Sequence, residues 1–350
     1  MSLPDLAAPR TAPENGRPFP LGAVVRLLVG VGLPALLVVR LGAGGVLDAL
    51  AAITAPTVLA ALALGAVVTV AGAARWCVVA RGVGLTLTLP AATTDAYRAT
   101  LLNSLLPAGV LGDVHRAVRH HRPGDGRGAR AVVLERVAGQ AVVVVVGAAV
   151  LLAQPALRAA LVAPGPLVAA GGLLAALVIA GAWLATARRA ARWRTGLVAG
   201  LRDLREGLAT RRTAPAVLVL SLVALAGLLA LFVLAARVAG VTAPLGQLLP
   251  LVTVALLAMS VPLTVGGWGP REAAAALAFA AVGLDPGQGL ATAVVYGVLA
   301  LISCLPGALV LLADAVGRPN ASRMPAPAAL PWRSCSPSSV TVRVRPTPAG

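Results

Sequence analysis

The sequence contains little charge and no lysine. Only 12% of its 350 residues are charged, whereas 59% are hydrophobic, and the mean hydropathy is +0.90. A soluble domain carries about a quarter charged residues, so this composition excludes a water-soluble globular protein of this length. The apolar residues instead form long runs that are more stable in lipid than in water. The sequence therefore predicts a multi-pass integral membrane protein.

Cysteine is also scarce, and this excludes several kinds of chemistry. Cys77, Cys304 and Cys335 are too few and too scattered for a disulfide framework or a thiolate metal site. The three histidines follow Asp113 in a basic loop without the acid or cysteine spacing that a metal requires. We therefore expect no metal, no cofactor and no catalytic residues. A membrane-embedded transferase is the weakest hypothesis, because no activated nucleophile is present.

The formal net charge of +17 does not indicate nucleic-acid binding. All basic residues are arginine, and they cluster in short loops between apolar runs, where they set topology and contact anionic lipid headgroups. The segment 113–130 has five arginines and the loop 187–213 has eight. The positive-inside rule places both segments in the cytoplasm. We expect the protein to reside in the inner (plasma) membrane.

Uncharged runs between the charged residues mark the expected crossings. A helix needs about 20 residues to cross the hydrocarbon core. The run between Arg237 and Arg271 contains three prolines and fits one crossing followed by an irregular tail. The other uncharged stretches of sufficient length are residues 49–74, 137–157, 159–187, 213–236 and 286–313. Residues 21–41 are also expected to cross, with Arg26 and Arg40 near the ends, where their side chains can reach the interfaces.

Two further apolar stretches are short for a crossing. Residues 99–112 must return to the side they came from, because Arg75 and Arg81 place the end of the preceding crossing inside and the next loop is also inside. Residues 273–284 either re-enter, which places the C-terminal tail outside, or span, which places it inside. We therefore predict an all-α, polytopic helical membrane protein with seven or eight transmembrane helices and two short re-entrant or broken helices.

The predicted membrane domain covers residues 21–315. Its flanking tails, 1–20 and 316–350, are rich in proline, serine and arginine and are expected to be disordered. The second tail is too short to be a catalytic domain.

Both short elements contain the same kind of break. Pro107 is followed by a glycine after five residues and by Arg116 after nine, and Pro262 is followed by Gly267 and Arg271 at the same distances. Glycine and proline interrupt a helix and leave backbone groups that must be buried in protein or line a wet cavity. Many transporters place a binding site at such interrupted repeats. The two breaks are therefore candidate sites.

The second break predicts an anion site. Proline is favoured in the first turn of a helix, so a helix should begin at Pro270 and direct free N–H groups at the preceding glycine loop. Arg271 adds a full positive charge beside them. Together these groups would attract a phosphate.

Three acids, Asp113, Glu135 and Glu272, lie beside or within apolar runs. They need partners, because placing a charge at membrane depth costs about 3 kcal/mol. Arg271 and Glu272 are adjacent, so on a helix their side chains should diverge and not neutralise each other. Arg75-Trp76 is interpreted only as an interfacial anchor. The expected ion pairs, around a cavity open to the cytoplasm, are Asp113 or Glu135 with Arg271, and Glu272 with Arg116 or Arg136.

The candidate substrate-binding residues combine these breaks and charges. They are Asn103, Asp113, Arg116, Glu135, Arg136, Gly266, Gly267, Arg271 and Glu272.

Motifs along nearly the whole predicted domain occur in a distinctive order. They are Arg75-Trp76; Asn103 to Pro107 with Gly109, Gly112, Asp113 and Arg116; Glu135-Arg136-Val137; Pro262, Gly266, Gly267, Gly269, Arg271 and Glu272; and Leu305-Pro306-Gly307. In this order they resemble the lysylphosphatidylglycerol synthase transmembrane region, also called the flippase-like integral membrane family. The resemblance covers residues 21–315.

The resemblance implies a protein that translocates or handles anionic phospholipids or polyprenyl-linked lipids. In the best-known members, the membrane part flips an aminoacylated phosphatidylglycerol made by a separate cytoplasmic domain. We expect no lipid aminoacylation by this chain, in which no such domain is found. Ala108 and Leu111 stand where the family usually has glycine, which leaves the identity of the lipid open.

We therefore predict a lipid flippase or lipid-transport protein rather than an enzyme. Its expected partners are membrane lipids and not nucleic acid. The sequence shows no ATP-binding loop, so transport would use a gradient or run downhill. The alternative is a non-transporting membrane scaffold for a separately encoded lipid-modifying or glycosylating enzyme, bound through loop 187–213.

Overall fold

The computed structural model describes residues 28–105, 111–119, 127–162, 213–259 and 267–316. Every regular element within these ranges is helical and none is a strand, which confirms the predicted all-α class. The chain divides into two compact units, Met1–Leu311 and Leu312–Gly350, and the helix packing below concerns the first. The predicted tails lie outside the described residues, apart from Val316.

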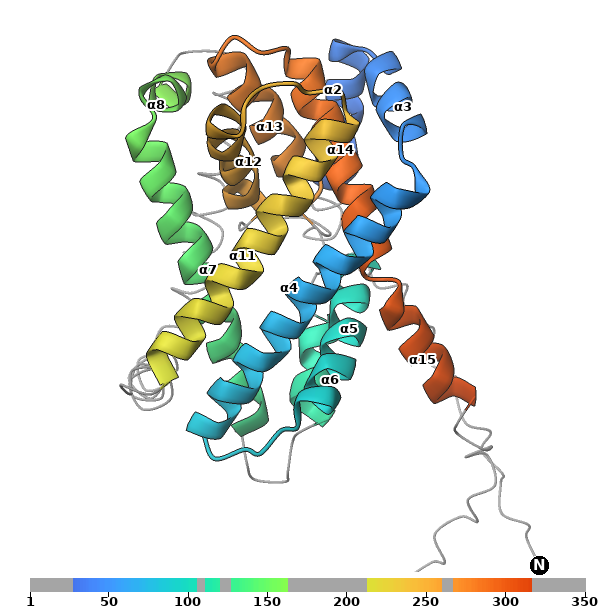
Figure 1. Ribbon diagram of the computed structural model, residues 1–350, viewed down its shortest axis with the longest axis vertical. Coiled ribbons are helices and arrows are strands. Elements are labelled where there is room, and N and C mark those ends of the chain that lie inside the picture. The colour runs from blue at the N-terminus through green and yellow to red at the C-terminus, as the bar shows by residue number, and fades with distance from the viewer. Residues whose placement is uncertain (1–27, 106–110, 120–126, 163–212, 260–266, 317–350) are drawn as a thin grey trace, which may run out of the picture. The chain divides into compact units, whose positions relative to one another are not determined.

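The described helices carry the labels of Figure 1. In chain order they are the π-helix η1 (Leu28–Gly32), α2 (Leu33–Leu41), α3 (Gly44–Ala51), α4 (Ala55–Gly82), α5 (Leu89–Leu105), α6 (Leu111–Arg119), α7 (Arg127–Ala153), α8 (Pro155–Val162), α11 (Thr213–Val238), α12 (Leu245–Met259), α13 (Pro270–Ala281), α14 (Pro286–Ser303) and α15 (Pro306–Val316).

Four helical segments in the described part are long and apolar enough to cross a membrane. They are α4, α7, α11 and the segment Pro286–Asp314, which joins α14 and α15. The bent pair formed by η1–α2 and α3 adds a fifth if it is one broken span. The predicted crossing at 159–187 lies almost entirely outside the described residues. The chain is thus a multi-pass helical membrane protein, while the predicted number of seven or eight crossings stays a prediction.

Two predicted crossings differ from the structure in shape. The first is not straight, because the chain turns by 106° between the helix that ends at Leu41 and α3. Gly42, with φ of +94°, makes this turn possible, since a residue with a Cβ rarely adopts that conformation. The crossing predicted at 137–157 begins ten residues earlier, at Arg127. A charged residue marks where lipid ends, but it does not end a helix.

The α5–α6 hairpin covers the first short element, residues 99–112, whose re-entry into the membrane stays a prediction. These two helices pack side by side and lie at the same end of the bundle, the lower end in Figure 1. Near their junction, the Asn103 side-chain oxygen accepts a hydrogen bond of 2.8 Å from the Gly112 N–H. A polar side chain thus satisfies a backbone donor that lipid would leave unpaired. The residues between the two helices lie outside the described part of the chain.

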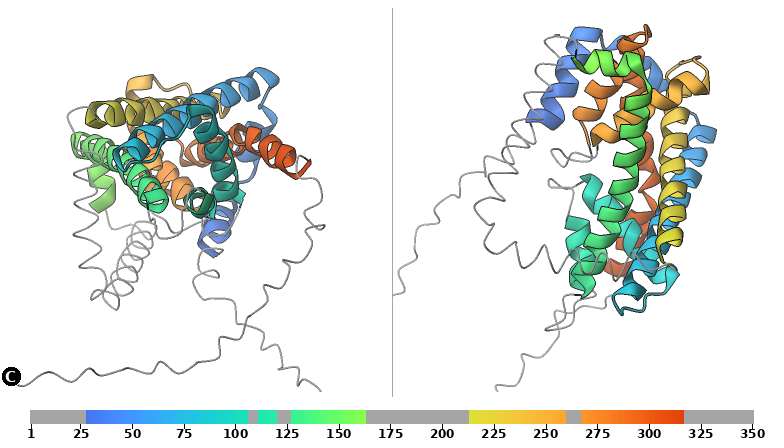
Figure 2. Two further views of the ribbon diagram at one scale, coloured as in Figure 1. Left: turned by 90° about the horizontal axis from the view of Figure 1, so that it is seen from below. Right: turned by 90° about the vertical axis from the view of Figure 1, so that its left-hand side faces the viewer.

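The α12–α13 hairpin covers the region of the second short element. The sequence predicts a full crossing within the run between Arg237 and Arg271, yet α12 has only 15 residues and spans about 22 Å. It packs against the 12-residue α13. The hairpin lies at the end of the bundle opposite to the α5–α6 hairpin, as Figures 1 and 2 show. Residues 273–281 lie in α13, and their re-entrant or membrane-spanning placement stays a prediction.

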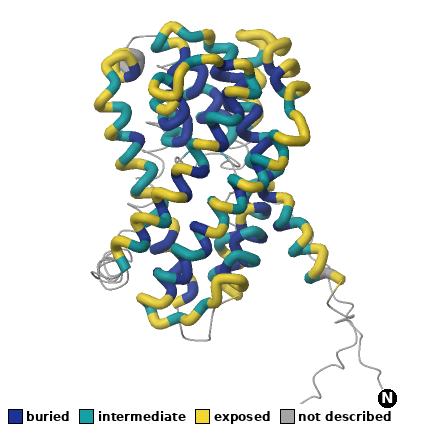
Figure 3. Tube along the Cα trace, viewed as in Figure 1, coloured by how far each residue is buried: buried dark blue, intermediate teal, exposed yellow. Residues whose placement is uncertain are grey.

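The long helices connect the two ends. α11 packs along α4, α14 contacts both of them, and α7 contacts α4, α11 and α12. Figure 3 shows buried residues concentrated where α12, α13 and α14 meet, and the core there includes Phe232 stacked on Tyr296 with 4.2 Å between ring centroids. Exposed leucines and valines such as Leu59 and Leu218 lie on the long helices, as expected for surfaces that face lipid.

Gly112 provides a test of the first hairpin. A Cβ at this position would meet the Ala99 carbonyl oxygen and lie 2.5 Å from the Ala99 Cα. Because these are backbone atoms, they cannot rotate away, and we expect Gly112→Ala to lower the free energy of unfolding by about 1–3 kcal/mol. Thermal unfolding in detergent measures this loss. Gly72→Ala on α4 is the control, because its Cβ would meet nothing within 4 Å and alanine favours helix. Equal stability of the two variants would contradict the close packing of α5 on α6.

Candidate functional site

The α5–α6 hairpin packs against α4 and α7 through a buried ionic network. Glu135, on α7, is only 4% exposed. Its Oε1 accepts from the Arg75 Nη2 at 2.6 Å and from Nε at 3.1 Å, and Arg75 also donates to the Ser221 hydroxyl of α11 at 3.1 Å. The Glu135 Oε2 lies 3.6 Å from the Arg116 Nη1 of α6. Glu135 therefore joins α4, α6 and α7, while Arg75 extends the network to α11.

Asp113, in the first turn of α6, extends this network. Its carboxylate lies 2.7 Å from Arg136 on α7 and 3.4 Å from Arg116, one turn further along α6. It also accepts a hydrogen bond of 3.2 Å from the Asn103 side-chain amide of α5. Asn103 therefore bridges the Gly112 backbone and the Asp113 carboxylate. The structure brings together five of the predicted substrate-binding residues: Asn103, Asp113, Arg116, Glu135 and Arg136.

Arg116 lies at the centre of this cluster. Its guanidinium carbon is 4.0 Å from the centroid of the Trp76 ring, a cation–π distance, and the residue is 5% exposed. Its Nη1 faces both Asp113 and Glu135. Its Nε is buried and has no hydrogen-bond partner among the described residues. Arg116 thus retains one donor that an additional acceptor could use.

A second ionic group on the same hairpin was not among the predicted site residues. Asp95 of α5 lies 2.7 Å from Arg98 on the same helix and 3.4 Å from Arg119 of α6. Asp95 and Arg98 are both buried. The spacing of three residues between an acid and an arginine in an otherwise uncharged helix is the sequence signal that identifies such a pair.

The charges on and around this hairpin do not cancel. In the described residues, five arginines and three carboxylates form the ion pairs of the two groups, and the side chains of Arg119 and Arg136 are 47% and 55% exposed. Solvent screens these two charges, whereas the three less exposed arginines are matched by the three carboxylates. The excess of arginine, together with the unused Nε of Arg116, is suited to an anion. The arginines are Arg75, Arg98, Arg116, Arg119 and Arg136, and the acids are Asp95, Asp113 and Glu135.

The second hairpin contains a neutral ion pair. Arg271 and Glu272, in the first turn of α13, are 1% and 0% exposed, and the Arg271 Nη2 and Nε both donate to Glu272 Oε1, the latter at 3.0 Å. Glu272 Oε2 accepts from the Gly269 N–H at 2.6 Å. The Arg271 guanidinium lies 4.6 Å from the Trp268 ring centroid and 5.3 Å from that of Tyr296.

The expected ion pairs between the two hairpins are therefore wrong. No ion pair in the described residues joins Arg271 to Asp113 or Glu135, or Glu272 to Arg116 or Arg136. Arg271 and Glu272, whose side chains were expected to diverge, form an ion pair with each other instead. Glu272 folds back to cap the start of α13, and the long Arg271 side chain reaches its carboxylate there. Gly267, with φ of +80°, lies in the turn before α13. Gly266 lies outside the described residues.

The interpretation of Arg75-Trp76 as an interfacial anchor is also incomplete. α4 continues to Gly82, so Arg75 lies two turns inside the helix, where it binds Glu135. Trp76 is 1% exposed beneath Arg116. The sequence does indicate that the helix continues beyond Arg75, since residues 76–80 extend the apolar run as far as Arg81.

Broken helical hairpins with buried ion pairs among long apolar helices define a polytopic membrane protein with polar sites inside its helix bundle. The family model described as the lysylphosphatidylglycerol synthase TM region matches residues 23–307, and the chain belongs to this family. This membership connects the chain with lipid modification or transport. No curated protein and no solved structure matches the sequence.

Proposed function

We propose that this chain moves an anionic phospholipid or a polyprenyl-linked lipid between the leaflets of the membrane. The observation that carries the proposal is the cluster of arginines around the α5–α6 hairpin, in which the buried Arg116 keeps an Nε donor without a partner among the described residues. A lipid phosphate would accept a hydrogen bond from that donor. The lipid tail would remain among the apolar side chains that the long helices expose.

Arg116 is the residue that we assign to the phosphate. Its side chain is held by Asp113, Glu135 and Trp76, so little conformational entropy is lost when a ligand binds. Its Nε remains as a donor for a phosphate oxygen. An arginine–phosphate contact is a charge-assisted hydrogen bond, which is stronger than a neutral one.

The start of α13 is a less suitable phosphate site than its sequence indicates. The helix does begin at Pro270, as predicted. However, the Glu272 carboxylate already accepts from the Gly269 N–H and neutralises Arg271. A phosphate there would have to displace a carboxylate, and it would then leave that carboxylate buried beside it. We therefore place the headgroup at Arg116.

A reconstitution experiment tests this assignment. The full-length protein is placed in phosphatidylglycerol vesicles with a trace of fluorescent phosphatidylglycerol, and dithionite added outside reports how fast the labelled lipid exchanges between leaflets. We expect Arg116→Gln to slow exchange by about tenfold or more, because loss of one charge-assisted hydrogen bond costs about 1.5–3 kcal/mol. Vesicles with labelled phosphatidylcholine or a polyprenyl phosphate compare the lipid classes.

Arg81→Gln is the matched control. Arg81 is exposed near the end of α4, and the same change of charge there should leave exchange unchanged. A wild-type rate in the Arg116→Gln variant would remove Arg116 from the site. Absence of exchange for every lipid class with the wild-type protein would contradict transport and favour the scaffold alternative. That alternative depends on loop 187–213, which lies outside the described residues.

A further inference from the structure

The ionic network that joins α4, α6 and α7 does not hold its three arginines equally tightly. Glu135 makes its shortest ion pair with Arg75, at 2.6 Å, and Asp113 makes its shortest with Arg136, at 2.7 Å. Arg116 lies at the longer distances of 3.4 Å from Asp113 and 3.6 Å from Glu135. Because Coulomb attraction weakens with distance, Arg116 is the arginine that these two acids neutralise least.

Arg116 and Arg136 offer donors of two kinds beside one carboxylate. The Arg116 Nε is buried and has no hydrogen-bond partner among the described residues. Arg136 contacts the other oxygen of the same Asp113 carboxylate, and its side chain is 55% exposed. A guanidinium has five N–H donors, so the exposed part of Arg136 keeps some for a ligand. An anion that reaches Arg116 can therefore also bind Arg136.

The two acids of the network do not exclude a phosphate from this place. Glu135 Oε1 accepts two hydrogen bonds from Arg75, at 2.6 and 3.1 Å. Asp113 accepts from the Asn103 amide at 3.2 Å in addition to its ion pairs. Each carboxylate is thus compensated by charge-assisted contacts. A phosphate oxygen at the Arg116 Nε would displace neither of the two shortest ion pairs.

The kind of phosphate decides how many of these donors a lipid can use. The phosphodiester of phosphatidylglycerol carries a single negative charge, and carbon flanks its phosphorus on both sides. A terminal phosphate, that is a phosphomonoester, carries a charge of about −1.5 to −2 at pH 7 and three acceptor oxygens. Because carbon flanks it on one side only, one of its oxygens can reach a buried N–H while another binds a second arginine.

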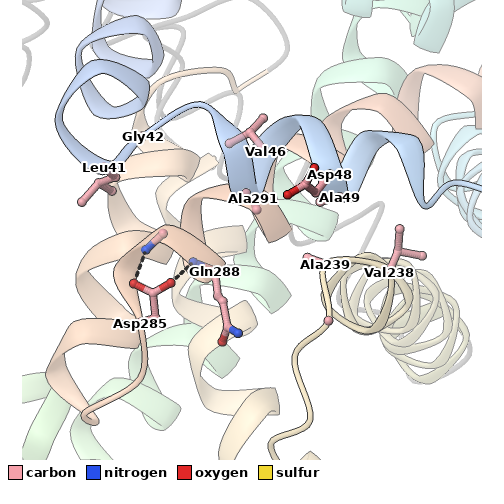
Figure 4. A pocket seen from close by; sticks show the side chains of 13 residues that line it. Leu41, Gly42, Val46, Asp48, Ala49, Val238, Ala239, Asp285, Gln288 and Ala291 are labelled. Carbon is pink, nitrogen blue, oxygen red and sulfur yellow. Dashed lines mark hydrogen bonds between the residues drawn. The ribbon is translucent and has the colours of Figure 1, made fainter.

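A cavity at the other end of the bundle has the opposite charge. Its volume is about 430 Å³, and the α2–α3 bend, the end of α11 and the start of α14 line it, as Figure 4 shows. Asp48 and Asp285 are its charged lining residues in the described part of the chain. Carboxylates repel a phosphate, so this cavity does not compete with the α5–α6 hairpin for the headgroup.

We propose that the site around Arg116 and Arg136 selects lipids that end in a phosphate over lipids with a phosphodiester headgroup. The inference rests on the proposed function, in which Arg116 contacts the lipid phosphate. Arg136 is the specificity-determining residue, because it binds the additional charged oxygen that a phosphodiester lacks. The shared chemistry is a phosphomonoester on an apolar tail, which occurs in phosphatidic acid and in polyprenyl phosphates.

Native mass spectrometry of the full-length protein tests this selection. The protein in phosphatidylcholine nanodiscs is supplied with equal amounts of phosphatidic acid and phosphatidylglycerol that have the same acyl chains. A second arm replaces phosphatidic acid by a polyprenyl phosphate. We expect the wild-type protein to retain at least one terminal phosphate over phosphatidylglycerol by about tenfold or more, the effect of one charge-assisted hydrogen bond. The arm that shows the preference identifies the tail as acyl or polyprenyl.

Two arginine variants locate the selection. Arg136→Gln should lower retention of the terminal phosphate by about tenfold and that of phosphatidylglycerol by less, so that the ratio between them falls. Arg81→Gln removes an exposed arginine near the end of α4, at the same end of the bundle, and should keep the wild-type ratio. The melting temperature of each variant confirms that it is folded.

The outcomes separate this inference from the proposed function. Equal retention of the terminal phosphates and phosphatidylglycerol by the wild type would overturn the selection. An unchanged ratio in Arg136→Gln would also overturn it, and so would an equal fall in Arg81→Gln, which would indicate general electrostatic attraction. In each of these cases, phosphatidylglycerol exchange between leaflets by the wild type would leave the proposed function standing. Retention of none of these lipids, with no exchange, would overturn both.

Discussion

Replacing Glu272 by alanine is expected to lower the free energy of unfolding by about 3–5 kcal/mol. Arg271 is 1% exposed, and no other acid forms an ion pair with it in the described part of the chain. The substitution therefore leaves a buried charge without its partner. It also removes the acceptor of the Gly269 N–H at the start of α13. Since proteins are stabilised by only about 5–15 kcal/mol in total, this loss is large.

Two further variants separate the charge from the cap. Glu272→Gln keeps an oxygen for the Gly269 N–H but removes the negative charge, so it should lose most of the same stability. The double variant Arg271→Met/Glu272→Gln removes both charges and should recover most of the loss. Thermal unfolding followed by tryptophan fluorescence measures all three, with Trp268 next to the pair. A double variant as unstable as Glu272→Gln would show that the charge of Arg271 is not what makes the single change costly.

Replacing Glu135 by glutamine should have a similar effect at the other hairpin and should also abolish lipid movement. Arg75 and Arg116 share this carboxylate, and Ser221 is the remaining side-chain partner of Arg75. Loss of the shared partner should cost about 3–5 kcal/mol. It should also leave Arg116 without one of the two acids that orient it. The lipid-exchange rate and the melting temperature together measure the result.

Arg136→Gln is the stability control for this prediction. Its side chain is 55% exposed, although it lies 2.7 Å from Asp113, so the pair is screened by solvent and should contribute about 0–1 kcal/mol. A Glu135→Gln variant that unfolds like Arg136→Gln would show that burial does not set the strength of this network. Full lipid exchange in a folded Glu135→Gln protein would contradict the proposed orientation of Arg116.

The helical class and most membrane helices could be predicted from the sequence, because lipid imposes a simple rule on composition. Segments such as α4 and α11 contain too few charges to be anything else. The same rule did not show that the apolar run between Arg237 and Arg271 contains the short helix α12, which ends at Met259, and a separate helix that begins at Pro270. Hydropathy measures whether a segment prefers lipid to water. It does not show whether the helix continues straight or turns back.

The candidate residues could also be predicted, but their partners could not. Arginine and acid at breaks in apolar runs identified Asp113, Arg116, Glu135, Arg271 and Glu272. Which acid pairs with which arginine depends on the distances between their side chains in the folded bundle, and the sequence does not give these distances. Glu135 meets Arg75 across 60 positions, and Arg271 meets its neighbour Glu272 because both fold back over one helix start.

The sequence alone determined that this chain is a helical membrane protein with two interrupted elements, since charged residues are scarce and both a charge and a helix-breaking proline are costly inside a lipid-embedded helix. Only the tertiary structure decided that the two interrupted elements carry separate ion pairs at opposite ends of the bundle, one confined to the start of α13 and one shared among α4, α6 and α7. Ion pairing depends on distances of a few ångströms between helices, and those distances are set by packing of the whole bundle.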